Sequence, residues 1–363
     1  MKKTKVVAFY LPQYHTIPEN DKWWGKGFTD WTNVKKAKPL FNDHKQPVKP
    51  LNDNYYDLSN IAILKEQADL AKEYGVDGFC YYHYWFKGQK LLEKPLEAML
   101  SDREVNIPFC LSWANDPWTR AWDGGTKDFL IRQDYGSTED WIDHINYLIP
   151  FFRDTRYIKV EERPVFLIYR TKDFSKFDEM IVLWNSILKR NNLKELYIIE
   201  TLNAFQSQPN LKISEAVVEF EPMISLSSDL TLRERINIFI NRKFITEVYD
   251  KPRIVSYDSI WKKILSRKPS KFLKLKDQKV LIRSGFVNWD NTPRKKNRGV
   301  VFSGGTPEKF ETNMRKLLNK SVQSKSEFIF INAWNEWAEG CYLEPDQTNG
   351  YEYLNSLKKA LKI

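Results

Sequence analysis

The sequence contains few cysteines and glycines and no long apolar segment. Its three cysteines form no Cys-x-x-Cys pair, which disfavours a disulfide framework and a structural zinc site. Cys80 and Cys110 lie inside apolar runs, which predicts buried free thiols. The 14 glycines in 363 residues exclude a collagen-like or glycine-linker architecture. No stretch approaches the ~20 apolar residues of a membrane-spanning helix.

The N-terminal residues also lack the pattern of an export signal. Residues 1–5 include three lysines, but the apolar run that begins at Val6 ends at Pro12. Such a run is too short for the core of a typical signal peptide. We therefore expect a cytoplasmic location.

Several catalytic motifs are missing. There is no P-loop, Gly-x-Gly-x-x-Gly, Gly-x-Ser-x-Gly or Asp-x-Asp motif, and the four histidines show no metal-ligand spacing. We therefore expect neither a metal nor an organic cofactor. His15 and His83 follow or end predicted strands among tyrosines, where they would either bind substrate or serve a structural role.

The net charge of +10 is concentrated in residues 262–298, where thirteen Lys and Arg face two Asp. The simplest interpretation is a solvated basic surface. A more specific one is contact with an anionic sugar, a phosphate- or lipid-linked substrate, or a membrane surface. Because no nucleic-acid motif accompanies this stretch, we do not expect a nucleic-acid partner.

Eight short apolar runs alternate with amphipathic segments. The predicted strands cover residues 6–11, 78–85, 107–113, 164–169, 196–201, 216–221, 280–287 and 328–333. The predicted helices cover residues 60–74 (with Ser59 as N-cap), 138–152, 177–190, 307–318 and 351–361. This alternation favours an α/β fold, a (β/α)8 TIM barrel, with a doubly wound open sheet as the alternative. We predict one domain, residues 1–363, with long insertions at about 16–57 and 225–276.

Aromatic residues are abundant, with 13 Trp, 18 Tyr and 22 Phe. Ten tryptophans lie at or beyond the predicted carboxyl ends of strands, or in the first insertion: Trp23, Trp24, Trp31, Trp85, Trp113, Trp118, Trp122, Trp289, Trp334 and Trp337. Barrel active sites are built at that end. The distribution predicts an aromatic groove for sugar rings; the alternative is bulky loop packing.

The strongest local motif is NAWNEWAEG, residues 332–340, directly after the last strand. On a turn, Glu336 and Glu339 can point to the same side. Glycosidic chemistry needs such a pair, one carboxyl protonated and the other ionised. The same spacing also occurs on solvated helix faces, but here two tryptophans and a glycine surround it.

Six blocks together resemble the WbsX family of polysaccharide-biosynthesis proteins, from near residue 6 to near residue 350. They are AFYLPQYH (8–15), WWGKGFTDW (23–31), DGFCYYHYW (77–85), WANDPWTR (113–120), WDNTPR (289–294) and NEWAEG (335–340). That family is similar to the endo-α-mannosidases of glycoside hydrolase family 99, which are retaining (β/α)8 barrels. The resemblance implies that Glu339 is the general acid/base and that Glu336 assists at the 2-hydroxyl through an anhydro-sugar.

We therefore expect an enzyme that acts on α-glycosidic linkages of a bacterial surface polysaccharide or its precursor, with Glu336 and Glu339 as the catalytic pair. The alternatives are a glycosyltransferase of O-antigen, capsule or lipopolysaccharide biosynthesis on the same barrel and a non-catalytic carbohydrate-binding barrel. The expected sugar-stacking residues are Trp24, Trp31, Trp85, Trp118, Trp289 and Trp337. The expected polar contacts are Tyr10, His15, Tyr82, His83, Asn115, Arg120, Asn291, Arg294 and Asn335.

Overall fold

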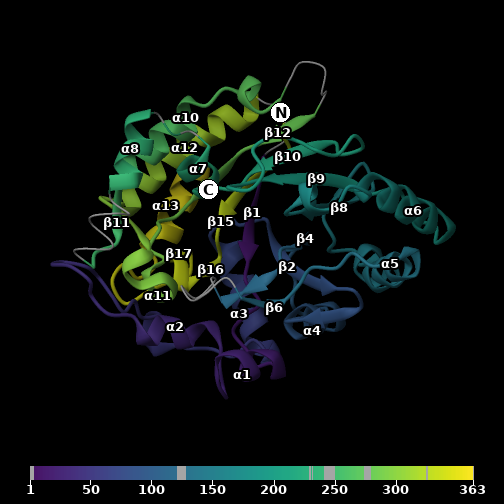
Figure 1. Cartoon of the computed structure of the whole chain (residues 1–363), viewed down its shortest axis with the longest axis horizontal. Coiled ribbons are helices and arrows are strands. Elements are labelled where there is room, and N and C mark those ends of the chain that lie inside the picture. The colour runs from purple at the N-terminus through teal and green to yellow at the C-terminus, as the bar shows by residue number, and fades with distance from the viewer. Residues whose placement is uncertain are drawn as a thin grey trace.

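A computed structural model describes residues 4–120, 128–228, 230, 232–240, 250–273, 279–323 and 326–362. Parallel strands form its central sheet (Figure 1). In the order in which they pair, these are β12 (Val280–Ile282), β10 (Ala216–Glu219), β9 (Tyr197–Leu202), β8 (Arg163–Ile168), β4 (Phe109–Trp113), β2 (Gly78–Phe86), β1 (Lys5–Tyr10), β15 (Phe328–Asn332) and β13 (Ser284–Phe286).

The sheet closes through its interrupted seventh strand. β12 pairs with β10 and β13 pairs with β15, and only Arg283 separates β12 from β13. The predicted seventh run is therefore one strand with a break. The eight predicted strands and the TIM-barrel fold are confirmed, and the open-sheet alternative is wrong.

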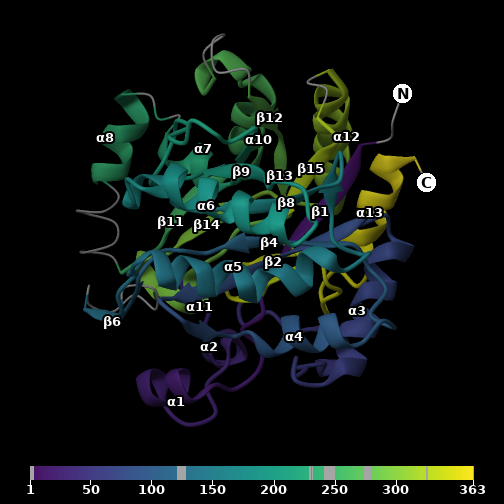
Figure 2. The same ribbon diagram turned by 90° about the vertical axis from the view of Figure 1, so that its right-hand side faces the viewer.

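Helices surround this sheet (Figures 1 and 2). They are α3 (Ile61–Glu73), α4 (Lys94–Ser101), α5 (Thr138–Arg153), α6 (Phe177–Arg190), α10 (Tyr257–Ser266), α12 (Pro307–Gln323) and α13 (Glu352–Leu361). α10 and α12 pack so closely against β13 that a side chain at Gly285 would meet the Met314 sulfur at 2.6 Å and the Trp261 ring at 3.1 Å. The N-cap of α3 is Asn60, whose side chain accepts from the Ala62 amide, so the Ser59 prediction is wrong.

The connection from β9 to β10 contains no helix, although all of residues 203–215 are described. The buried carboxylate of Glu200 accepts hydrogen bonds from the backbone amides of Asn210 at 2.7 Å and Leu211 at 3.1 Å. These bonds fold the loop back against the end of β9. The thiols of Cys80, Cys110 and Cys341 are buried and free, as predicted for the first two.

The first predicted insertion, residues 16–57, holds α1 (Pro18–Trp24), α2 (Asp30–Lys36) and the 3-10 helix η1 (Leu51–Asp53). Within the second, 225–276, lie the end of α7 (Met223–Ser227), α8 (Leu232–Ile240), β11 (Arg253–Ser256), the barrel helix α10 and η5 (Pro269–Lys271). Residues 229, 231, 241–249 and 274–276 of this insertion, which include Lys274 and Lys276 of the basic stretch, lie outside the described residues, as does Trp122. The single-domain organisation stays a prediction.

The remaining short elements are β3 (Gln89–Leu91), β5 (Trp118–Thr119), β6 (Phe129–Ile131), β7 (Lys159–Val160), η3 (Thr171–Asp173), α11 (Thr292–Lys295), η7 (Lys296–Arg298), β14 (Val300–Ser303), β16 (Asn335–Glu336), η8 (Trp337–Glu339) and β17 (Cys341–Tyr342). Among the described helices, none has the length and apolar composition needed to span a bilayer.

Candidate active site

A hairpin directly after β15 carries both glutamates of the NAWNEWAEG motif. β16 pairs with β17 in antiparallel fashion, and η8 forms the turn between them. The turn ends at Gly340 in the left-handed conformation (φ 60°), where a side chain would meet the Asp290 amide nitrogen at 2.8 Å. Both Glu336 and Glu339 line a cavity of about 360 Å³.

Tyr14 holds this hairpin from behind. Its hydroxyl donates to the Asn335 carbonyl at 2.5 Å and accepts from the Trp337 amide at 3.2 Å. The Asn335 side chain bonds both the amide and the carbonyl of Leu11, at 2.8 and 2.9 Å. The backbone on either side of Glu336 is therefore fixed by buried hydrogen bonds.

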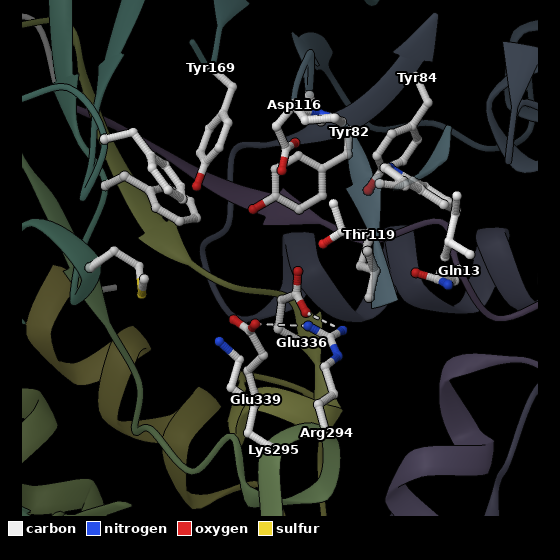
Figure 3. Close-up of a pocket in the computed structure, with 18 of the residues that line it drawn as sticks. Gln13, Tyr82, Tyr84, Asp116, Thr119, Tyr169, Arg294, Lys295, Glu336 and Glu339 are labelled. Atoms are coloured by element: carbon white, nitrogen blue, oxygen red, sulfur yellow. Dashed lines mark hydrogen bonds and ion pairs between the residues drawn. The ribbon is translucent and has the colours of Figure 1, made fainter. Parts of the chain in front are cut away.

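One guanidinium joins the two glutamates. Arg294, from α11, donates to Glu339 at 2.8 Å and to Glu336 at 3.1 Å (Figure 3). It also donates to both carboxylate oxygens of Asp30, from α2, at 2.7 and 3.3 Å. We call Asp30, Arg294, Glu336 and Glu339 the cavity cluster. It contains three carboxyl groups and one arginine.

Burial in this cluster favours the neutral form of Glu336. Its side chain is 8% exposed, and burial raises its pKa to about 8 against the opposing effect of Arg294. Glu339 adds negative charge that raises it further. The Glu339 side chain, 22% exposed, is the more open of the two. The raised pKa of Glu336 therefore favours a proton on this carboxyl group near neutral pH.

Aromatic side chains form much of the cavity wall. They are Trp24, Tyr82, Tyr84, Trp118, Tyr169, Phe205 and Phe220. Tyr82 and Tyr169 lie across the cavity from the two glutamates (Figure 3). Predicted Trp24, Trp118, Tyr82 and Arg294 are thus brought together with Glu336 and Glu339.

The other predicted tryptophans lie in the core. Trp31, Trp85, Trp289 and Trp337 are between 1% and 7% exposed and do not line the cavity. The Trp31 and Trp337 indoles donate instead to the Tyr56 carbonyl and the Glu344 carboxylate. This placement corrects the expectation that all six tryptophans stack on sugar, because position at a strand end does not decide which way a side chain points.

Several residues that were predicted to contact sugar form hydrogen bonds within the protein instead. The Tyr10 hydroxyl donates to Gln67, and the Asn291 side chain accepts from the Val300 amide. Asn115 bonds the backbone of Arg170 and, like Asn335, is fully buried. None of these side chains lines the cavity, so their expected role as sugar contacts is corrected to a structural one.

Neither predicted histidine faces the cavity. His83 lies 2.8 Å from His144 between ring nitrogens, and burial lowers its pKa to about 3. His15 contacts the Pro12 carbonyl through Nδ1 at 2.9 Å and is 1% exposed. Both therefore fit the structural alternative. Arg120 lies at the surface, with its guanidinium 5.6 Å from the centre of the Trp24 ring.

Sequence reasoning missed three charged residues of the site: Asp30, Asp116 and Lys295. Asp116 lines the cavity opposite the glutamates, and burial raises its pKa to about 6 (Figure 3). Asp30 and Asp116 lie inside the aromatic blocks at 23–31 and 113–120, and Lys295 follows the block at 289–294. The sequence signal that could have identified Asp30 and Asp116 is an acidic residue between two tryptophans. Among the described residues, no group of three His, Cys, Asp or Glu is arranged to hold a metal ion.

Comparison with solved structures shows the same fold. A glycoside hydrolase-like protein superposes with a TM-score of 0.59 at 14% identity, covering all of this chain and 95% of that one. The family 99 endo-α-mannosidase from Bacteroides thetaiotaomicron, in complex with bis-tris propane, gives a TM-score of 0.57 at 12% identity, with 98% and 96% coverage.

Sequence relatives show the family. Two proteins called WxcX, from two strains of Xanthomonas campestris pv. campestris, are each 36% identical over 366 residues. The match covers 98% of this chain and 49% of theirs, so the chain spans about half the length of these curated relatives. Residues 6–357 match the family described as glycosyltransferase WbsX, and the chain belongs to this WbsX family.

Proposed function

We propose that this chain is a retaining glycoside hydrolase that cleaves α-glycosidic linkages of a bacterial surface polysaccharide or its precursor. One observation carries the proposal: two carboxyl groups of a single turn share one guanidinium and face an aromatic cavity. One retained proton gives the pair an acid and a base at once. The cavity volume lies in the range typical of small-ligand sites, roughly 300–1,000 Å³.

In the proposed reaction, Glu336 and Glu339 act on opposite sides of the bond being broken. Ionised Glu336 takes the proton of the 2-hydroxyl, and that oxygen bonds to the anomeric carbon. Protonated Glu339 gives its proton to the departing glycosidic oxygen, which leaves a 1,2-anhydro-sugar. Water then opens this ring: Glu339 takes a proton from the water, and Glu336 returns one to the 2-oxygen.

This scheme requires the proton to lie on Glu339 when a sugar is bound. Burial raises the pKa of Glu336 and so favours the proton there, whereas the proposed reaction starts with it on Glu339. Arg294 donates to both carboxyl groups, so one guanidinium faces both positions of the proton in this scheme. Arg294 then stabilises whichever glutamate is ionised.

A second candidate is glycosyl transfer by the same site. The family description names a glycosyltransferase, and Lys295 lines the cavity on the same side as Glu339 (Figure 3). An ammonium group at this position suits a departing phosphate. In this alternative the sugar comes from a nucleotide or lipid diphosphate donor.

The test offers both kinds of substrate to the same preparation. α-Linked oligosaccharides, among them α-mannosides, are incubated in one arm, and nucleotide sugars with an oligosaccharide acceptor in the other. Hydrolysis with retained anomeric configuration, detected by NMR, supports the proposal. Transfer without hydrolysis that persists in a Glu339→Gln variant overturns it in favour of the second candidate. Sugar binding without turnover in either arm supports a binding barrel.

A further inference from the structure

Helix α8 turns its apolar side chains toward solvent. Leu232, Ile236, Phe239 and Ile240 are 75%, 50%, 63% and 42% exposed. At 3.6 residues per turn they share one stripe, about 100° wide. A surface helix normally buries such a stripe against its own protein. Large exposed apolar patches mark interaction sites.

Charged residues of α8 follow the same pattern. Arg233 and Arg235 are exposed and lie on the two edges of the apolar stripe. Glu234, on the opposite side of the helix, forms an ion pair with Lys263 of α10 at 2.5 Å. The helix is therefore attached to the barrel by its acidic side and presents an apolar stripe edged by arginine.

We propose that α8 lies in the surface of an anionic lipid bilayer, with its apolar stripe among the lipid chains. Interfacial helices combine an apolar face with basic residues that contact anionic headgroups. Basic residues also lie on the barrel side of α8: Lys263, which pairs with Glu234, lines a hollow of about 400 Å³ together with Lys268 and Lys271. This surface belongs to the basic stretch that the sequence linked to a membrane contact.

The charge pattern disfavours a second copy of this chain as the occupant. In a symmetric dimer the same patch meets itself, so the arginine edges would face each other. Like charges across an interface oppose association, and the whole chain carries a net charge of +10. An anionic bilayer satisfies both the apolar stripe and its basic edges.

The proposed membrane contact lies close to the cavity along the chain. Met223 lines the cavity and begins α7, and α8 begins at Leu232. Figure 2 shows α8 at the periphery of the molecule. Bilayer binding would hold the cavity near saccharides carried on lipid. The inference goes beyond the proposed function and does not depend on it, because binding is measured without turnover.

The test is co-sedimentation of the protein with vesicles. We expect binding to phosphatidylcholine vesicles that contain about a third phosphatidylglycerol, and weaker binding to phosphatidylcholine alone. Leu232→Ser with Phe239→Ser should lower the partition coefficient at least about tenfold, because two apolar anchors are lost. Arg233→Gln with Arg235→Gln should lower it by a similar factor at low salt. The matched control is Val182→Ser, an equally exposed apolar residue of α6 (60%).

Circular dichroism and thermal melting check that each variant is folded. We expect all variants to fold, because the substituted side chains are exposed. The proposal is overturned if the wild type does not bind vesicles, if it binds neutral and anionic vesicles equally, or if the Leu232 and Phe239 variant binds as well as the wild type. It is also overturned if light scattering shows that α8 mediates a dimer instead.

Discussion

The barrel buries two clusters of arginine and carboxylate, and their compositions differ. The cavity cluster has three carboxyl groups for one guanidinium. The wall cluster, formed by Glu219, Glu221, Arg267 and Arg283, has two of each. Arg283 donates to Glu219 at 2.8 Å, and Arg267 contacts both glutamates. None of the wall cluster lines the cavity.

The difference in composition distinguishes two buried glutamates whose pKa values are both raised. Burial raises the pKa of Glu221 as it does that of Glu336. In the wall cluster two guanidinium groups balance two carboxyl groups, and all four side chains are at most 4% exposed. In the cavity cluster the excess of carboxyl groups retains a proton beside open space. We infer that the wall cluster fixes the loop after α10 to the barrel, and that the cavity cluster carries the chemistry.

The largest expected effect separates the clusters by activity. Glu336→Gln and Glu339→Gln should each lower kcat/KM about 10³-fold or more, because each removes a proton donor or acceptor. Melting temperatures measured below pH 4.5 should change little, because Glu336 is then protonated in both the folded and the unfolded state. Glu221→Gln, the matched control, should leave kcat/KM of the folded enzyme within a few-fold. Equal losses in all three variants would contradict the division of roles.

A next test separates the clusters by stability. Arg267→Met leaves buried Glu221 without a close cation and Glu219 with Arg283 alone, and it should destabilise the fold by about 3–5 kcal/mol in urea denaturation. The activity of the remaining folded protein should be retained. Arg294→Met, in contrast, should abolish activity even under conditions where the protein is folded. An active Arg294→Met variant would show that the shared guanidinium is dispensable.

The retained proton predicts a pH dependence. The folded pKa of Glu336, about 8, lies above its ordinary value of 4.5, so the folded state binds the proton more tightly. Its contribution to stability is complete below pH 4.5 and is lost as the pH rises to about 8. Relative to Glu336→Gln, the wild type should lose up to about 1.4 kcal/mol per pH unit in that window. If the difference in unfolding free energy between the two proteins stays constant from pH 4.5 to 8, the retained proton does not lie on Glu336.

The smallest expected effect concerns the aromatic wall. Trp118→Ala should raise the substrate KM about tenfold through lost stacking, with kcat changed less. The control is Phe129→Ala. Phe129 is an aromatic residue on the neighbouring strand β6 that is 47% exposed, and its loss should change neither KM nor kcat. If the two variants behave alike, Trp118 acts by holding the loop and not by contacting sugar.

The sequence predicts much of the barrel, because strands and helices follow local patterns. All eight strands were found, and α6 has the predicted bounds. The break at Arg283 was missed, since its side chain is held by Glu219, 64 residues away. The N-cap was misplaced by one residue, because Ser59 and Asn60 are both good caps and only the fold selects between them.

The site was harder to predict than the fold. Glu336 and Glu339 were predicted because one short motif contains both, and both line the cavity. Asp30, the third partner of Arg294, was not found, because it lies 264 residues away from Arg294 in sequence. Trp85 illustrates the remaining errors: it lies near the end of β2, one residue before Phe86, but its ring stacks on His144 at 4.5 Å and does not line the cavity. Such contacts are set by packing between distant segments.

The two acids come from the hairpin of β16 and β17, whereas the cavity wall comes from other parts of the chain. Four consecutive residues, 336–339, hold both acids, so their spacing is a local property of one turn. The cavity wall, in contrast, is assembled from loops after several strands. Exchange of those loops would change which sugar is accepted while the acids keep their separation. The architecture therefore lets specificity diverge without disturbing the reaction, which makes the loops carrying Trp24 and Trp118 the natural positions for redesign.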